Sequence, residues 1–266
     1  MKKLYPTLII SLLFLLIGCS TELDTLQKRD DTYYEIISEE PFSGLIINKY
    51  ESGQKHTKGY LTNGREDGYW TWWYEGSPKN HIRLYLDNIL DNLPYLFYDS
   101  WENYGQKRKV VDYLDGTKDG LSTEWYENGQ KKSEGKFEDD KKDDLWKDYY
   151  ENGQLQEEGH YKEGKYEGLW RRYFDNGILS IKGNYKDDKQ EGFWKSYYDN
   201  GQLYLDRIYK DGKLEGLWKS YYDNGQLKYE WNYKEGELIS QKCWDENGNK
   251  IECELGINLK YPTTLP

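Results

Sequence analysis

Tryptophan recurs at a constant interval in the second half of the chain, and this interval limits the possible folds more than any other feature of the sequence. Trp146, Trp170, Trp194 and Trp218 are each 24 residues apart. Glycine keeps the same step at Gly129, Gly153, Gly177, Gly201 and Gly225. A fixed period of this length is typical of repeat arrays, in which each copy packs only against its neighbours. The sequence therefore predicts a repeat array rather than a conventional globular domain.

The composition indicates that the repeating unit is built from β-strands. The 266 residues include 28 Tyr, 11 Trp and 26 Gly but no Ala. Aromatic residues favour strands, Gly and Asn favour turns, and all of them are weaker helix formers than Ala. With 32% charged residues, the chain has too few aliphatic side chains for a thick core. We expect a thin, ordered, all-β structure.

Each 24-residue copy has the pattern of a β-hairpin. In the copy at residues 217–233, the segments LWKSYY and LKYEWNY flank Asn224-Gly225. Asn-Gly between alternating segments favours a two-residue type I′ loop. In that register Tyr222 pairs with Leu227 and Trp218 with Trp231, so the apolar side chains share one face. The same register sets Trp146 opposite Gly159, Trp170 opposite Gly183 and Trp194 opposite Arg207, and each Gly leaves room for an indole ring.

The first twenty residues have the pattern of an export signal. Lys2 and Lys3 precede an apolar run over residues 8–17 that is too short to span a bilayer comfortably. The run ends in Leu-Ile-Gly-Cys19, which resembles the lipobox of bacterial lipoproteins; the alternative is an ordinary secretory signal with an incidental cysteine. The resemblance implies cleavage before Cys19, its acylation, and anchoring to a membrane of the cell envelope. Ser20 after the cysteine favours the outer membrane, by resemblance to Gram-negative lipoproteins.

The 24-residue period extends in both directions to about nine copies. Earlier copies open near residues 44, 68, 96 and 120, with about four extra residues inserted around 88–93, and the last copy is shortened. The predicted fold is an elongated, twisted antiparallel meander of β-hairpins, because wide open sheets rarely stay flat. We expect a signal peptide (1–18), a lipidated cysteine and tether (19–43), the repeat array (44–253) and a C-terminal tail (254–266).

The face opposite the tryptophans carries a file of aromatic residues with a file of cations beside it. The aromatic file is Trp125, Tyr149, Tyr173, Tyr197 and Tyr221, and the cations two residues before the last four are Lys147, Arg171, Lys195 and Lys219. One interpretation is that these side chains form cross-strand ladders that stabilise the sheet. The other is a binding stripe, because aligned exposed aromatics beside cations suit a long or flat partner.

The sequence motifs GxWxxYYDNGQL and GxYKDGKxEG, which recur in tandem with a period of 24 residues, resemble the MORN repeat variant. In bacteria this β-hairpin repeat is often assigned to YwqK-type antitoxins. The resemblance covers about residues 44–250. It implies an elongated meander of hairpins that serves as a protein or lipid interaction scaffold, with no catalytic residues in the repeat. For an exported chain it further implies an immunity-like role against an exported toxin.

The sequence does not suggest catalytic or cofactor chemistry. Three His occur, at positions 56, 81 and 160, and they occupy unrelated places in their copies. They therefore indicate neither a metal site nor a Ser-His-Asp arrangement. Acid pairs such as Asp139-Asp140 fall in turns and lack the spacing of a calcium loop. We predict a non-enzymatic protein that holds no cofactor and no metal.

The net charge of −11 argues against nucleic acid as a partner, because phosphate binding needs a basic surface. The leading hypothesis is an envelope lipoprotein that binds the membrane through its lipid anchor and a protein partner through its array. The alternative is a carbohydrate- or cell-wall-binding module, since aromatic side chains stack on sugars. An enzyme would need a site in the irregular segment 86–104, where no residue has an evident role.

Cys243 and Cys253 flank the last Asn-Gly turn, at Asn247-Gly248. An exported chain meets an oxidising compartment, which would allow a disulfide between them. A two-residue loop would pair Cys243 with Glu252 and point Cys253 to the opposite face, so a bridge requires a bulge or a longer loop. A disulfide here would covalently link the two strands of the terminal hairpin, which has no further copy to pair with.

Overall fold

The computed structural model describes residues 21–36, 38, 40–76 and 105–253. Within these ranges the chain forms β-strands, turns and one 3₁₀ turn, η1 (Leu23–Thr25), and it contains no α-helix. No helix in the described ranges is long and apolar enough to cross a membrane. The predicted signal peptide, Cys19, the insert at 88–93 and the tail at 254–266 lie outside the described residues. The chain divides into two compact units, residues 1–143 and 144–266.

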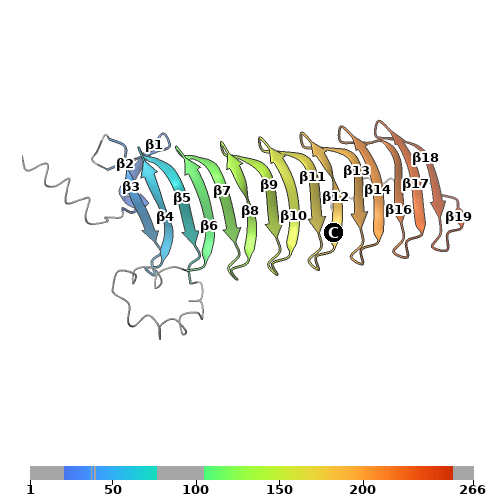
Figure 1. Cartoon of the computed structure of the whole chain (residues 1–266), viewed down its shortest axis with the longest axis horizontal. Coiled ribbons are helices and arrows are strands. Elements are labelled where there is room, and N and C mark those ends of the chain that lie inside the picture. Colours follow the sequence, from blue (N-terminus) through green and yellow to red (C-terminus); the bar gives the residue numbers. More distant parts are fainter. Residues whose placement is uncertain (1–20, 37, 39, 77–104, 254–266) are drawn as a thin grey trace, which may run out of the picture. The chain divides into compact units, whose positions relative to one another are not determined.

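The first unit is an antiparallel meander in which consecutive strands lie side by side in sequence order (Figure 1). Its strands are β3 (Gly44–Lys49), β4 (Lys55–Thr62), β5 (Arg65–Trp73), β6 (Lys107–Leu114), β7 (Thr117–Trp125) and β8 (Lys131–Glu138). β5 pairs directly with β6. Residues 77–104, where the sequence predicted the second strand of one copy and the first strand of the next, lie outside the described part of the chain.

The predicted tether is partly structured. Residues 21–36 contain η1 and a short hairpin of β1 (Leu26–Arg29) and β2 (Thr32–Glu35). Thr21 bridges to Ile46 on β3, and the side chains of Leu23 and Tyr33 pack against the buried cluster of Ile46, Leu61 and Trp70. This part of the predicted tether therefore packs on the meander, and its apolar residues cover the first strand, which would otherwise be an open edge.

The second unit repeats the same meander through consecutive antiparallel pairs (Figure 1). Its strands are β9 (Lys141–Tyr149), β10 (Leu155–Lys162), β11 (Lys165–Tyr173), β12 (Leu179–Lys186), β13 (Lys189–Tyr197), β14 (Leu203–Lys210), β15 (Lys213–Leu214), β16 (Gly216–Tyr221), β17 (Leu227–Lys234), β18 (Glu237–Trp244) and β19 (Lys250–Ile251). The predicted class, an all-β antiparallel meander of hairpins, is confirmed.

The type I′ turn predicted at Asn-Gly is wrong, because the structure has that turn between copies instead. The type I′ conformation, with positive φ at both central residues, occurs between copies, as at Asp211 (φ 50°) and Gly212 (φ 79°). In the Asn-Gly turn within a copy only the Gly has positive φ, 84° at Gly225. The backbone N–H of Tyr222 donates to the carbonyl of Gln226 at 2.9 Å, so the loop has three residues rather than two.

The Asn side chain explains the three-residue loop. Asn224 Oδ1 accepts a hydrogen bond from the backbone N–H of Gln226 at 2.9 Å, an arrangement that Asn adopts readily in turns. As a result Tyr221, and not Tyr222, pairs with Leu227. A bulge beside Ser220 then returns the strands to the predicted register, and Trp218 faces Trp231 as expected.

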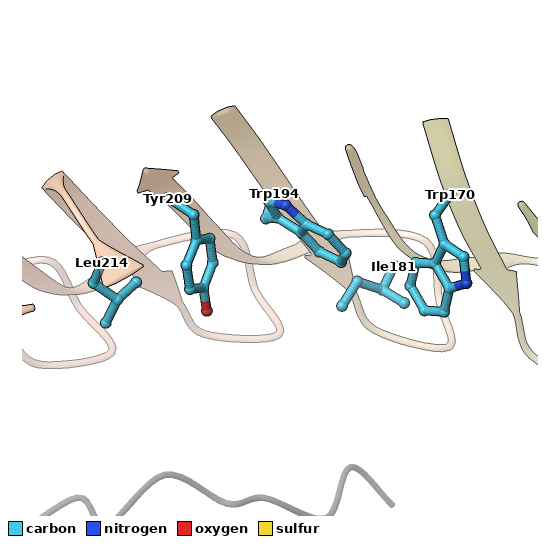
Figure 2. Packing of buried hydrophobic residues seen from close by; sticks show 5 residues of the cluster. All are labelled: Trp170, Ile181, Trp194, Tyr209 and Leu214. Carbon is cyan, nitrogen blue, oxygen red and sulfur yellow. The ribbon is translucent and has the colours of Figure 1, made fainter. Parts of the chain in front are cut away.

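The core of the second unit lies on one face of its sheet, which we call the tryptophan face. Figure 2 shows Trp170, Ile181, Trp194, Tyr209 and Leu214 extending from successive strands to the same side. The ring centroids of Trp170 and Trp194 are 5.6 Å apart, and Tyr209 meets Trp194 edge-on at 6.2 Å. Trp194 is only 1% exposed. Large rings that overlap along the sheet thus bury one another, which replaces the missing aliphatic core.

Gly183 provides the space for one of these rings. A Cβ at Gly183 would lie 2.1 Å from Cδ2 of Trp194. The sequence predicted that the Gly makes room for its cross-strand partner, Trp170. Instead, the indole of the following strand leans back over the glycine, because a ring of this size reaches beyond its own strand.

Candidate interaction face

The predicted aromatic file occupies the ends of strands. Tyr149, Tyr173, Tyr197 and Tyr221 are the last residues of β9, β11, β13 and β16, and Trp125 is the last residue of β7 in the first unit. All five are half-buried. In the second unit the aromatic file and the cations alternate with the tryptophans along each strand, so they lie on the opposite face, which we call the stripe face.

The cations on the stripe face are tied to acids on neighbouring strands. Arg171 contacts Glu158 at 2.7 Å and Lys195 contacts Asp206 at 2.7 Å. These hydrogen bonds raise the pKa of both cations above the ordinary values. In the next copy Glu230 lies 3.8 Å from Lys219 and 2.7 Å from Lys242, and the bond from Lys242 lowers the pKa of Glu230. Lys147 pairs in register with Glu158. The contacts show cross-strand charge ladders on this face.

The tyrosines of this face also interact with the ladder, and burial raises their pKa values. The hydroxyl of Tyr173 donates to Glu158 at 3.1 Å. Burial, followed by the charge of Glu158, raises the pKa of Tyr173, and burial also raises the pKa of Tyr221. Both phenols are therefore neutral near pH 7.

The most accessible apolar side chains of the stripe face belong to a file that the sequence prediction did not include. This file precedes each tryptophan by one residue, and its members Phe193 and Leu217 are 66% and 46% exposed. Phe193 and its counterpart Leu169 line a shallow depression of about 330 Å³. The depression is also lined by Arg171, Tyr173, Lys182 and Lys195. The available signal was the apolar residue that precedes each of the four tryptophans spaced 24 residues apart: Leu145, Leu169, Phe193 and Leu217.

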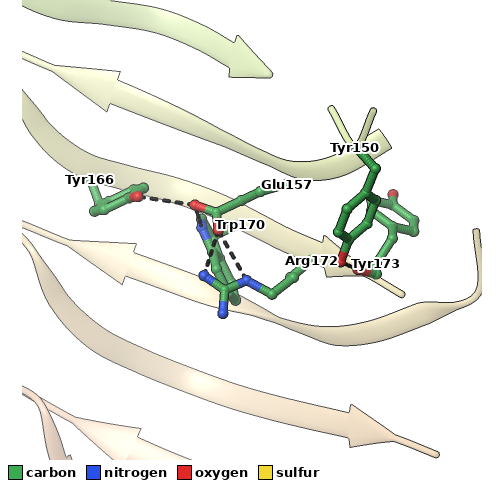
Figure 3. Close-up of polar contacts among 6 residues, drawn as sticks. All are labelled: Tyr150, Glu157, Tyr166, Trp170, Arg172 and Tyr173. Atoms are coloured by element: carbon green, nitrogen blue, oxygen red, sulfur yellow. Dashed lines mark hydrogen bonds and ion pairs between the residues drawn. The ribbon is translucent and has the colours of Figure 1, made fainter. Parts of the chain in front are cut away.

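Where a copy has a second tyrosine after the strand, as at Tyr150 and Tyr198, its hydroxyl links that copy to the next. The hydroxyl of Tyr150 donates to the backbone carbonyl of Tyr173 at 2.8 Å, as Figure 3 shows, and Tyr198 reaches Tyr221 in the same way at 2.7 Å. At the other end of the strands, Glu191 Oε2 accepts a hydrogen bond from the backbone N–H of Asp211 at 2.9 Å. Glu167 and Glu215 make the equivalent contacts with Asp187 and Glu235.

One polar cluster interrupts the tryptophan face. Glu157 accepts hydrogen bonds from Tyr166 at 3.1 Å and from Trp170 Nε1 at 2.8 Å, and it contacts Arg172 at 2.8 Å (Figure 3). The next copy has Ile181 at the place of Glu157. Because all four groups satisfy one another, the cluster is a structural substitute for apolar packing rather than a binding site.

Cys243 and Cys253 form a disulfide with a Cα–Cα distance of 5.3 Å. Asp245 N–H donates to the carbonyl of Asn249, so the last turn also has a three-residue loop. Cys243 therefore pairs with Ile251, two residues before Cys253, which brings the second cysteine to the same face. The longer loop supplies the geometry that a bridge requires. Among the described residues, no group of three or more His, Cys, Asp and Glu could hold a metal ion.

Comparison with known proteins agrees with this geometry for the central copies. No curated protein matches the chain. The family model described as MORN repeat variant matches five segments, residues 118–139, 145–163, 166–187, 190–211 and 214–235, each of which spans one strand, a turn and the strand that follows.

Proposed function

We propose that this protein is a non-enzymatic envelope lipoprotein, anchored through Cys19, whose repeat array presents the stripe face to a protein partner. The observation that carries the proposal is that most recurring residues of a copy serve the structure, whereas one recurring apolar residue does not. The tryptophan, the second tyrosine, the Asn-Gly turn and the Glu before the bulge are used in packing or in links between copies. Phe193 and Leu217 have no such use and remain exposed on the stripe face.

An exposed apolar file beside charge ladders has the chemistry of a protein interface, where apolar anchors are surrounded by polar groups. Glycan binding needs aromatic rings with an open face, and Tyr173 and Tyr197 are half-buried. Protein binding is therefore the better supported of the two candidate functions. An immunity-like role is the special case in which the bound protein is an exported toxin.

The proposal is tested by using the protein to capture its partner from an extract of the cell envelope. Full-length protein in detergent is compared with a Phe193→Ser/Leu217→Ser variant, which alters exposed side chains and should keep the fold. A Leu238→Ser/Ile239→Ser variant changes two exposed apolar residues on β18 and is the matched control. We expect a specific protein with the wild type and the control but not with the first variant. Capture that is equal for all three would refute the stripe face as the binding surface.

Replacing Tyr173, Tyr197 and Tyr221 together by Ala separates the two interpretations of the aromatic file. Loss of the partner with an unchanged circular dichroism spectrum supports a binding stripe, and unfolding supports ladders alone. Binding of peptidoglycan instead of a protein, reduced by Tyr221→Ala, would favour the carbohydrate alternative. The anchor is tested by mass spectrometry of the mature N-terminus and by Cys19→Ser, which should release the protein from membranes.

A further inference from the structure

The charge ladder of the stripe face breaks its own pattern at one residue. Across the second unit, acids stand in register between two cations: Glu158 between Lys147 and Arg171, Asp206 between Lys195 and Lys219, and Glu230 between Lys219 and Lys242. At the equivalent position of the remaining copy the residue is Lys182, which lies in register between Arg171 and Lys195. Three cations therefore occupy adjacent strands.

Lys182 makes no ion pair within the described part of the chain, and its ammonium lies 5.9 Å from the centre of the Tyr197 ring. Its two neighbours each have one acid partner, on the far side from Lys182. Neighbouring strands are about 4.8 Å apart, so the three cations span roughly 10 Å. Like charges in this arrangement repel one another and cost stability. An acid here would relieve that repulsion, as it does in the other copies.

The three cations also line the depression between Leu169 and Phe193. Phe193 is 66% exposed, and Asn184 lines the same depression. A ligand that fits must therefore carry closely spaced negative charges with an apolar group beside them. Resting on the proposed protein-binding function, we propose that this depression binds an extended acidic peptide segment of the partner, with carboxylates on the Arg171–Lys182–Lys195 row and an apolar side chain against Phe193.

The surroundings of the depression favour a narrow ligand over a membrane surface. The Asn-Gly turns at one end of these strands carry the exposed acids Asp175 and Asp199, whereas at the other end exposed lysines flank the acids of each turn. A broad anionic bilayer resting on this face would meet Asp175 and Asp199, which would repel it. An extended peptide that runs across the strands along the cation row reaches the cations without contacting the turns.

The inference is tested by fluorescence polarisation with a labelled peptide, acetyl-(Glu-Glu-Leu)₂-amide, which in an extended conformation presents both Glu and Leu on each side, and with its Gln counterpart. Full-length protein should bind the Glu peptide and not the Gln peptide, with affinity that falls as salt rises. Lys182→Glu restores the ladder, so it should weaken peptide binding about tenfold or more while raising the melting temperature. Lys210→Glu changes the charge equally, at an exposed strand end outside the depression, and should leave binding unchanged.

Equal binding by Lys182→Glu and wild type, or no binding of the Glu peptide by either, would overturn the inference. Binding to vesicles of anionic phospholipid but not to the peptide would also overturn it, in favour of a membrane surface. The outcome is separable from that of the proposed function: if the partner captured from extract is lost with Phe193→Ser/Leu217→Ser but retained with Lys182→Glu, the stripe face binds protein and the acidic-peptide site is refuted.

Discussion

The hydroxyl of Tyr198 donates a hydrogen bond to the backbone carbonyl of Tyr221 at 2.7 Å, 23 residues further along the chain. The same link joins Tyr150 to Tyr173 and Tyr222 to Trp244. A sheet one layer thick has no second layer to lock its copies together. These bonds supply part of that connection, and they explain why tyrosine rather than phenylalanine recurs at this place.

One copy provides a natural test of the link, because Phe174 stands where the others have tyrosine. Its backbone N–H donates to the carbonyl of Ile178, as in the other turns, so the ring enters the same local structure. We expect Phe174→Tyr to stabilise the array by about 1 kcal/mol and Tyr198→Phe to destabilise it by a similar amount. Urea denaturation measures both. If Tyr198→Phe leaves the free energy of unfolding unchanged, the hydrogen bond of the hydroxyl contributes no more to stability than its hydration in the unfolded chain does.

The bulge in the first strand of each copy leads to a prediction about Asp144. Gly168, Gly192 and Gly216 have φ of +84°, +68° and +72°, and Asp144 occupies the equivalent place with φ +59°. A non-glycine residue in this region costs roughly 1 kcal/mol. Asp144→Gly should therefore raise the free energy of unfolding by up to about 1 kcal/mol. The gain is reduced by whatever the weak 3.6 Å contact between Asp144 and His160 contributes, because the glycine loses it. Gly192→Ala is the reverse change and should destabilise the fold; stabilisation by it would contradict the argument.

The facing pairs Trp218–Trp231 and Trp170–Gly183 were predictable because a period-two pattern tolerates only one register. The three-residue loop at Asn224-Gly225 was not, because a bulge beside Ser220 cancels the extra loop residue and leaves the same facing pairs. For the stripe face, the sequence indicated the files of aromatic residues and cations but neither the acids that pair with the cations nor the break at Lys182, because a charge alternation is visible only when the strands are set side by side.

Alkaline pH should unfold the second unit. Burial, helped by the nearby Tyr166, raises the pKa of Tyr185 from its ordinary 10.0 to about 12, and burial raises the pKa of Tyr166 further. The unfolded chain loses these protons near pH 10 while the folded chain keeps them, so stability is fully present below pH 10 and falls as pH rises toward 12 and above. Tyr185→Phe should move the alkaline unfolding midpoint, followed by circular dichroism, to higher pH. Phenolate absorbance that grows in one step near pH 10 with the fold intact would contradict this.

The Glu157–Arg172 pair on the tryptophan face should behave as a unit. Removing one member leaves the other charge partly buried without its partner, which is commonly worse than losing both. Glu157→Ile alone should destabilise by about 1–3 kcal/mol, because Arg172, Tyr166 and Trp170 lose their shared acceptor. Glu157→Ile/Arg172→Ser reproduces the residues of the next copy, Ile181 and Ser196, and should recover most of the loss. A double-mutant cycle in urea measures the coupling, and additive effects of the two changes would refute it.

The disulfide between Cys243 and Cys253 should hold the final hairpin and little else. β18 has six exposed residues, 237–242, and β19 adds only two residue pairs to it, so packing contributes little there. Closing a loop of this length stabilises by about 2–3 kcal/mol in the chain-entropy description.

Cys253→Ser should therefore raise amide hydrogen exchange in β18 and β19 while leaving β10 to β14 protected, because each copy contacts only its neighbours. The matched control is Ser240→Cys in the Cys253→Ser background, which keeps two cysteines but places the second on β18 itself. Loss of protection throughout the unit would mean that the copies unfold together and that the last hairpin caps the whole sheet.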